Sequence, residues 1–174
     1  MADAAKGALT ELGIEFQLHS HPAVFTVEEQ EKHIHHLPGH HTKNLFMKDK
    51  KHGMFLVTAR ANANVSTKNL PKLLGITGKT NLRMCSADTL MEKLGVAPGS
   101  VSPLCVMNNK DNDVRLVLDQ ALTEGDLVNC HPNQNDETVA LAPADLLKFV
   151  KQHPLTVMIF ERQKVIIEIS SKFK

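Results

Sequence analysis

From residue 44 to residue 58 the sequence places two apolar segments around a polar turn: Asn44-Leu45-Phe46-Met47-Lys48-Asp49-Lys50-Lys51-His52-Gly53-Met54-Phe55-Leu56-Val57-Thr58. Segments 44–48 and 54–58 have the length and the large apolar side chains of buried strands. Residues 49–53 end in a glycine, which gives the conformational freedom that a tight connection needs. The stretch therefore predicts a β-hairpin, so a sheet is part of the fold.

Helices and a strand are predicted before this hairpin. Apolar residues recur at steps of four and three over residues 5–12, and Gly13 is typical of the residue that follows a helix. A strand over 14–18 comes next, because apolar and polar residues alternate there. Residues 26–29 have the spacing of a capping box, which predicts a second helix that ends before the Pro-Gly pair at 38–39.

The mixture continues after the hairpin. Helices are predicted at 70–74, 87–94 and 143–150, and strands at 104–108, 114–118, 126–130, 138–141 and 156–160. The first two of these strands are expected to form a second hairpin. Without regular βαβ alternation, a repeat or a linker, the pattern indicates one α+β domain over residues 1–174. Within it, residues 161–174 form a C-terminal extension whose role the sequence does not define, although part of it alternates like a strand.

Composition excludes several classes of protein. The 174 residues are 42% hydrophobic with a net charge of +1, which favours an ordered core over a disordered chain. No apolar run approaches the roughly 20 residues of a membrane-spanning helix, and the N-terminus lacks a signal-peptide pattern. The three cysteines are too widely spaced for a disulfide framework or a zinc knuckle. These features predict a cytoplasmic protein with reduced thiols and no membrane partner.

Charge is unevenly distributed along the chain. Residues 1–83 carry a net charge of +4 and residues 84–174 a net charge of −3. The net charge of +1 therefore excludes DNA binding and a broadly basic RNA-binding surface. The uneven distribution still allows a local basic patch. Three lysines near the first hairpin turn are candidates for contacts with RNA phosphates: Lys48, Lys50 and Lys51. The alternative is that they form a solubilising hairpin tip.

Histidines are concentrated before the hairpin, with five between residues 33 and 41. Imidazoles bind zinc, but no neighbouring cysteine or HExxH pattern completes a ligand set. A solvated polar segment is the favoured interpretation. We therefore expect neither a metal site nor a cofactor.

Three further features have the residue types of a polar active site. Lys43 stands at the entry to the first hairpin strand, where its ammonium can bind a phosphate or a carbonyl oxygen. Residues 95–103 contain two glycines and two prolines, and such a loop can direct N–H groups toward an oxyanion. His131 begins a polar turn and could be an acid, a base or an orienting group. Each feature alone also fits an ordinary surface lysine, structural turn or loop histidine.

Taken in order, four motifs resemble the YbaK/prolyl-tRNA synthetase editing-domain family, above all its freestanding members that clear alanine from mischarged tRNA(Pro). The motifs are His21-Pro22-Ala23-Val24-Phe25-Thr26-Val27-Glu28-Glu29, His41-Thr42-Lys43-Asn44-Leu45-Phe46-Met47-Lys48-Asp49, Gly99-Ser100-Val101-Ser102-Pro103, and His131-Pro132 with Asn135 and Thr138. The resemblance extends from about residue 5 to residue 160. It implies an α+β fold with a mixed, partly barrel-like sheet surrounded by helices. It also implies hydrolysis of an aminoacyl ester without a metal or a covalent intermediate.

The resemblance also implies which residues form the site. Catalytic roles fall on Lys43, Gly99, Ser100, Val101, Ser102 and Pro103, and substrate contacts on Thr26, Asn44, His131 and Asn135. For a small apolar substrate pocket we further expect Val24 or Phe25, together with Val101, as walls. The expected partner is the acceptor end of a mischarged tRNA, with prolyl-tRNA synthetase as a transient contact. A pocket shaped for proline rejects a smaller amino acid by only about 1–3 kcal/mol, so a second site too small for proline completes a double sieve.

Three functions stay open at this point. The favoured one is a trans-editing deacylase for alanyl-tRNA(Pro). The second is the same chemistry on cysteinyl-tRNA(Pro) or another mischarged tRNA, which depends on the volume of the pocket. The third is a non-catalytic module that binds a synthetase or tRNA, and the intact Lys43 and residues 99–103 argue against it.

Overall fold

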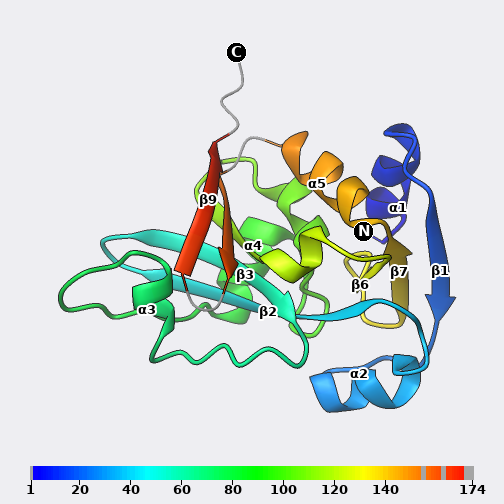
Figure 1. Ribbon diagram of the computed structural model, residues 1–174, viewed down its shortest axis with the longest axis horizontal. Coiled ribbons are helices and arrows are strands. Elements are labelled where there is room, and N and C mark those ends of the chain that lie inside the picture. Colours follow the sequence, from blue (N-terminus) through cyan, green and yellow to red (C-terminus); the bar gives the residue numbers. More distant parts are fainter. Residues whose placement is uncertain (1, 154–155, 162–163, 171–174) are drawn as a thin grey trace.

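The computed structural model describes residues 2–153, 156–161 and 164–170, and its strands form one mixed sheet with helices around it (Figure 1). The strand order is β1-β7-β6-β2-β3-β5-β8-β9, and β4 pairs with β2 outside this path. The elements are α1 (Ala2–Glu11), β1 (Phe16–Ser20), α2 (Val27–Ile34), β2 (His40–Asp49), β3 (Gly53–Arg60), α3 (Leu70–Leu73), β4 (Arg83–Met84), α4 (Ala87–Leu94), the 3₁₀ helix η1 (Pro103–Asn108), β5 (Val114–Asp119), the 3₁₀ helix η2 (Gln120–Thr123), β6 (Val128–Cys130), β7 (Glu137–Leu141), α5 (Pro143–Lys151), β8 (Thr156–Glu161) and β9 (Lys164–Ser170).

Strand β2 joins the two halves of the sheet. Its first residues, His40 and His41, pair in parallel with β6, whereas residues 42–49 pair antiparallel with β3. In Figure 1, β1 and β7 stand upright while β2 and β3 run across the view, so the sheet curls strongly along its path. The start of β2 is therefore the junction between the halves, and Lys43 lies directly after the change of partner.

The predicted hairpin is confirmed as β2 and β3, with both strands longer than expected. Asp49 pairs with Gly53 at the end of the ladder, where Gly53 has a φ of 89°. The Asp49 carboxylate binds the His52 ring at 2.7 Å and accepts hydrogen bonds from backbone N–H groups, including that of Lys51 at 2.9 Å. These interactions, led by the one with His52, hold the pKa of Asp49 far below its usual range. The turn is thus fixed by its own aspartate.

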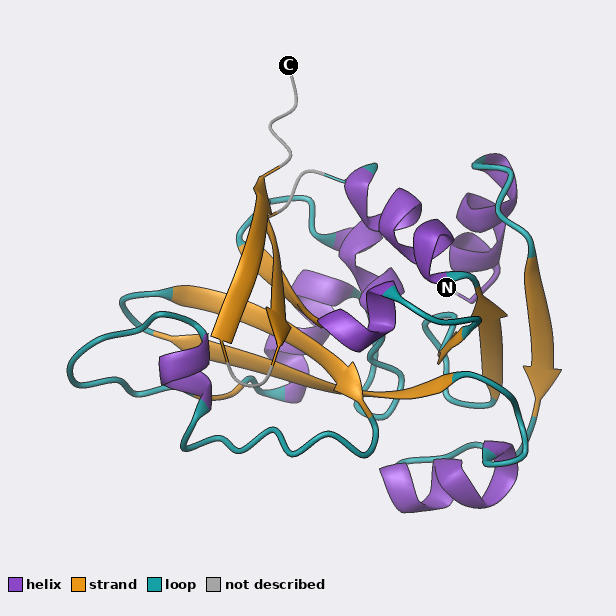
Figure 2. Cartoon of the chain, in the orientation of Figure 1, coloured by secondary structure: helices purple, strands orange, loops and turns teal. Residues whose placement is uncertain are grey.

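The core lies on both faces of this hairpin. Leu56 of β3 joins a large cluster with side chains of α4 and α5, whereas Phe55 and Val57 join a smaller cluster with side chains of α3. Successive side chains of a strand point to opposite faces, so β3 is covered on both sides. Figure 2 shows α2 apart from the other helices, beyond the start of β2. This position lets α2 form a wall of a cavity instead of closing the main core.

The predicted strand over 104–108 is wrong, because this segment forms η1. Pro103 has no N–H for a strand ladder, and the Ser102 hydroxyl accepts a hydrogen bond from the Leu104 N–H at 3.0 Å, which caps the helix. Short apolar runs do not distinguish a buried strand from a buried helix turn. The expected second hairpin is wrong as well, since β5 pairs in parallel with β3 and with β8.

The other predicted elements are present, with ends shifted by a few residues. The alternating part of the C-terminal extension forms β9, which pairs antiparallel with β8. Residues 162–163 and 171–174 lie outside the described residues. Cys85, Cys105 and Cys130 are free thiols, as expected, and the last two are buried. Within the described ranges, no helix is long and apolar enough to cross a membrane.

Candidate active site

A cavity of about 150 Å³ opens where α2, the start of β2 and the loop before η1 come together. All four sequence motifs contribute to its wall, although they lie far apart in the chain. The lining residues are Val24, Phe25, Thr26, Val27, Gln30, Thr42, Lys43, Asn44, Gly99, Val101 and His131. The fold therefore brings most of the predicted site residues together.

Lys43 is half-buried, and it lies just after the point where β2 changes its partner from β6 to β3. Its ammonium donates a hydrogen bond to the backbone carbonyl of Ala63, in the segment after β3. An ammonium has three N–H groups, so this contact holds the charge in place and leaves donors for a ligand. Among the described residues, no carboxylate lines the cavity to neutralise it. The cavity thus presents a fixed positive charge.

The loop at residues 99–103 combines a required glycine with two available donors. Gly99 has a φ of +88°, and a Cβ there would lie 3.3 Å from the Val24 carbonyl oxygen. The Ser100 N–H donates to the Ala97 carbonyl at 3.1 Å, and the Ser102 N–H donates to a thiol at 3.3 Å. In the described part of the chain, the N–H groups of Gly99 and Val101 have no hydrogen-bond partner. Both residues line the cavity, so their N–H groups are the donors that an oxyanion could use.

The three other residues of the predicted loop do not reach the cavity. Ser100, Ser102 and Pro103 are buried and do not line the cavity. Ser102 caps η1, and its N–H is held by the Cys105 sulfur. Their contribution is to fix the backbone, so any oxyanion contact falls on Gly99 and Val101.

Two asparagines that were expected to touch the substrate connect the walls of the cavity. The Asn44 Nδ2 donates to the Val101 carbonyl at 3.0 Å, and its Oδ1 accepts a hydrogen bond from the Thr58 hydroxyl at 2.6 Å. The Asn135 Nδ2 donates to the Val24 carbonyl at 2.8 Å, and Asn135 itself does not line the cavity. Asn44 therefore ties the loop to the hairpin, and Asn135 ties the segment before α2 to the turn before β7.

Val24, Phe25 and Thr26 form the wall beside α2, each in a different way. Val24 is buried, whereas Phe25 is 71% exposed at the rim. The Thr26 hydroxyl accepts a hydrogen bond from the Glu29 N–H at 3.1 Å, as the predicted capping box requires. The Glu29 carboxylate, however, accepts from the Phe25 N–H at 2.7 Å, one residue earlier than expected. Phe25 thus has a fixed backbone and a free ring.

His131 contributes a neutral imidazole. Its Nδ1 lies 2.9 Å from the Glu137 carbonyl oxygen, which can only accept, so Nδ1 carries the proton and Nε2 has a free lone pair. Burial lowers the pKa of His131, with the hydrogen bond to the Glu137 carbonyl acting in the opposite direction. The ring of His21 lies 6.1 Å away between centroids, and its charge would lower the pKa further.

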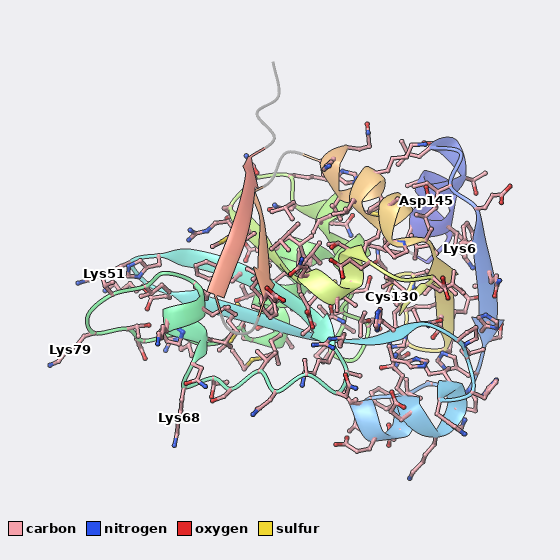
Figure 3. The ribbon with its side chains drawn as sticks, in the orientation of Figure 1. Lys6, Lys51, Lys68, Lys79, Cys130 and Asp145 are labelled. Carbon is pink, nitrogen blue, oxygen red and sulfur yellow. The ribbon has the colours of Figure 1, made fainter. Side chains whose placement is uncertain are left out.

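The candidate phosphate-binding lysines lie away from the cavity. Lys50 and Lys51 are exposed in the turn at the far end of β2, roughly 20 Å from Lys43 at ~3.3 Å per residue. Figure 3 shows Lys51 on the same side of the molecule as Lys68 and Lys79, far from Cys130 of β6. Lys48 lies within β2, between these two regions. Proximity in sequence therefore did not mean proximity to the cavity.

The sequence did not indicate Gln30 or Thr42, although both line the cavity. Gln30 is buried on the same face of α2 as Ile34, four residues later. A glutamine at a position where a helix turns an apolar face inward was the available signal. As for metals, the described residues contain no group of three or more His, Cys, Asp or Glu side chains able to hold one.

Comparison with known proteins defines the class. Residues 21–149 match the family model of the aminoacyl-tRNA editing domain. This match spans more than half of the chain and includes every residue that lines the cavity. The chain therefore belongs to the aminoacyl-tRNA editing domain family.

Two relatives and one solved structure are similar to the chain over most of its length. The chain is 42% identical over 164 residues to the Bos taurus prolyl-tRNA synthetase associated domain-containing protein 1, covering 91% of this chain and 95% of the relative. It is 36% identical over 154 residues to the prolyl-tRNA editing protein ProX of Acetoanaerobium sticklandii, covering 88% and 92%. A crystal structure of a candidate trans-editing enzyme for prolyl tRNA synthetase superimposes with a TM-score of 0.67 at 20% identity, covering 88% and 93%. This last likeness shows the α+β editing-domain fold.

Proposed function

We propose that this protein is a trans-editing deacylase that hydrolyses the ester of alanyl-tRNA(Pro). The observation that carries the proposal is the cavity itself. It is small, it holds a fixed ammonium, and two N–H groups without partners belong to residues of its wall. The relationship to prolyl-tRNA editing proteins supports the choice of tRNA.

The reaction needs a placed water and a stabilised oxyanion. Water adds to the ester carbonyl, the N–H groups of Gly99 and Val101 stabilise the resulting oxyanion, and the tetrahedral intermediate then expels the ribose oxygen, which takes up a proton. Lys43 holds the terminal phosphate or another polar group of the substrate in register. The free lone pair of His131 Nε2 is suited to orienting the water. The products are free alanine and intact tRNA.

We propose that selectivity depends on size. The cavity of about 150 Å³ is below the ~300–1,000 Å³ of ordinary small-molecule pockets, which suits a small amino acid, and the exclusion of proline is the part of the proposal that the prolyl ester tests. Phe25 lies at the rim with most of its ring exposed, in a chain that has no Trp and no Tyr. We therefore assign the Phe25 ring to stacking on the terminal adenine of the tRNA. Such a contact does not depend on the rest of the tRNA sequence.

The test is a comparison of three esters on the same tRNA. Alanyl-, cysteinyl- and prolyl-tRNA(Pro) are incubated with the wild-type protein, and the loss of label is followed against a control without protein. We expect rapid loss of alanine, slower loss of cysteine and retention of proline. Faster loss of the cysteinyl ester would assign the same chemistry to the other substrate. Equally slow loss of all three esters, with or without protein, would leave only a non-catalytic module that binds tRNA or a synthetase.

Location and partners follow from this assignment. A deacylase for mischarged tRNA acts where aminoacyl-tRNA is made, so we place the protein in the cytoplasm, in transient contact with prolyl-tRNA synthetase. Only the acceptor end of the tRNA needs to reach the cavity. The exposed Lys50 and Lys51, together with Lys48, are then candidates for contacts with phosphates farther along the acceptor stem.

A further inference from the structure

Gln30 differs from every other polar side chain that lines the cavity. It is only 7% exposed, yet its amide forms no hydrogen bond within the described part of the chain. The hydroxyls of Thr26 and Thr42, the amide of Asn44 and the ammonium of Lys43 each have a protein partner. The amide of Gln30 therefore opens into the cavity with its hydrogen-bonding capacity unused.

The Gln30 amide is accessible from the cavity although the residue as a whole is buried. Its polar atoms are not among the fully enclosed atoms that lack a partner in the described residues, so a ligand in the cavity can reach them. The helix gives no reason for a polar residue there, because Gln30 lies four residues before the buried Ile34 on the inward face of α2. An apolar residue of similar size would fill the same space. The polar group is thus best explained by a ligand that enters the cavity.

The donors and acceptors of the cavity indicate which part of the ligand Gln30 meets. Lys43 and the N–H groups of Gly99 and Val101 are donors, and they suit the ester carbonyl and the phosphate. Among the described side chains of the wall, Oε1 of Gln30 and Nε2 of His131 accept no hydrogen bond, and the Thr42 hydroxyl, which donates to the Asn129 carbonyl, also keeps its lone pairs. No carboxylate among the described residues lines the cavity. An aminoacyl ester carries one strong donor, its α-ammonium, and that group needs an acceptor.

We propose that Oε1 of Gln30 accepts a hydrogen bond from the α-ammonium of the aminoacyl group and thereby positions the ester. The inference rests on the proposed function, and it adds a requirement to it. The site recognises a free α-amino group, so it acts on aminoacyl-tRNA and leaves esters with a blocked amine, such as peptidyl-tRNA, intact. Gln30 is a positioning residue, since it touches the substrate away from the bond that breaks.

The experiment compares alanyl-tRNA(Pro) with propionyl-tRNA(Pro), in which a hydrogen replaces the ammonium and no bulk is added. The two esters differ in intrinsic reactivity, so the quantity that matters is how the ratio of their kcat/KM values changes between proteins. Gln30→Met keeps the size of the side chain and removes the acceptor. We expect it to lower this ratio by about tenfold or more, because a hydrogen bond to a charged group contributes ~1.5–3 kcal/mol.

Two further variants separate recognition from folding. Gln30→Glu keeps an acceptor at the same place, and we expect it to keep the wild-type ratio or raise it. Gln17→Met changes an exposed glutamine on β1 and should leave the ratio unchanged. A structural defect would lower the rates on both esters together, and a thermal melt identifies it directly. An unchanged ratio in Gln30→Met would overturn the inference while the deacylase function stands, whereas no hydrolysis of alanyl-tRNA(Pro) by the wild-type protein would overturn the function itself.

Discussion

The two ends of β2 place polar groups in opposite surroundings. At its start, Lys43 and Asn44 are half-buried and are held by hydrogen bonds to neighbouring segments. At its far end, Lys50 and Lys51 are exposed in the turn. Groups fixed before the substrate arrives can stabilise a transition state without reorganising, whereas mobile surface charges mainly attract a polyanion. We therefore propose that the start of β2 carries out the chemistry and that its far end attracts the tRNA.

The largest effect is expected from adding a side chain at Gly99, in the loop that lies beside the start of β2. Gly99→Val places a Cβ 3.3 Å from the Val24 carbonyl oxygen at a φ of +88°, so the donors of the loop must move. We expect kcat to fall by about 10²–10³, the usual effect of losing an oxyanion donor. The matched control is Gly78→Val, which has a φ of +83° but open space around it. Normal turnover by Gly99→Val, with both proteins folded by circular dichroism, would refute the role of the loop backbone.

A smaller loss is expected when the tie between β2 and the loop is cut. Asn44→Ala removes the 3.0 Å hydrogen bond to the Val101 carbonyl, so kcat should fall by roughly tenfold and the free energy of unfolding by about 1 kcal/mol. Thr58→Val leaves that bond in place and removes only the hydroxyl that orients Asn44 at 2.6 Å. We expect it to retain more activity than Asn44→Ala. Single-turnover kinetics and urea denaturation measure both variants. A lower activity in Thr58→Val than in Asn44→Ala would mean that the Asn44–Val101 hydrogen bond does not position Val101.

Acidification should act on the chemical end through His131. Burial lowers its pKa below the ordinary 6.5, so the folded protein keeps this imidazole neutral while the unfolded chain takes up a proton first. The stability that this residue contributes is therefore complete above about pH 6.5 and is lost as the pH falls through the folded pKa. Activity should decline in the same direction, because a protonated ring cannot accept a hydrogen bond. The decline should begin below about pH 6.5, the ordinary pKa from which that of His131 is lowered.

A pH profile of kcat tests this expectation directly. His131→Gln keeps a polar side chain that does not titrate, so its profile should be flatter over the same range, from a lower maximum. The opposing influences of His21 and Asp136 on His131 are secondary to burial. An identical acid decline in His131→Gln would place the titrating group elsewhere.

The smallest effect is expected at the lysine end. Replacing both Lys50 and Lys51 by alanine should change kcat little and raise KM by a few-fold. The slope of log affinity against log salt concentration should become shallower by up to about 1–2 units, because fewer counterions are released. A control with Lys110 and Lys151 replaced, two exposed lysines on other elements, should leave the slope unchanged. An unchanged slope in the variant that lacks Lys50 and Lys51 would mean that the turn between β2 and β3 only keeps the protein soluble.

How much the sequence could predict depends on how local the cause is. The hairpin, the capping residue Thr26 and the glycine at position 99 follow from rules that act over a few residues, and they were found. Segment 104–108 was assigned as a strand because an apolar run alone does not reveal that Ser102 and Pro103 begin a helix.

Other features depend on how the elements pack. Lys50 lies near Lys43 in sequence, but an extended strand separates the two by roughly 20 Å. The unpaired amide of Gln30 exists only because α2 packs beside the start of β2, and no local pattern contains that information. The roles of Asn44 and Asn135 as ties likewise require knowing which carbonyls face them.

The most direct test of the account is the single-turnover rate of alanyl-tRNA(Pro) deacylation with protein in excess, for the wild type and for Lys43→Ala. Excess protein removes differences in tRNA affinity, so the rate reports only on the chemical end of β2. The account predicts rapid loss of alanine with the wild type and a rate lower by about 10²-fold or more in the variant. Equal rates for the two proteins would contradict it.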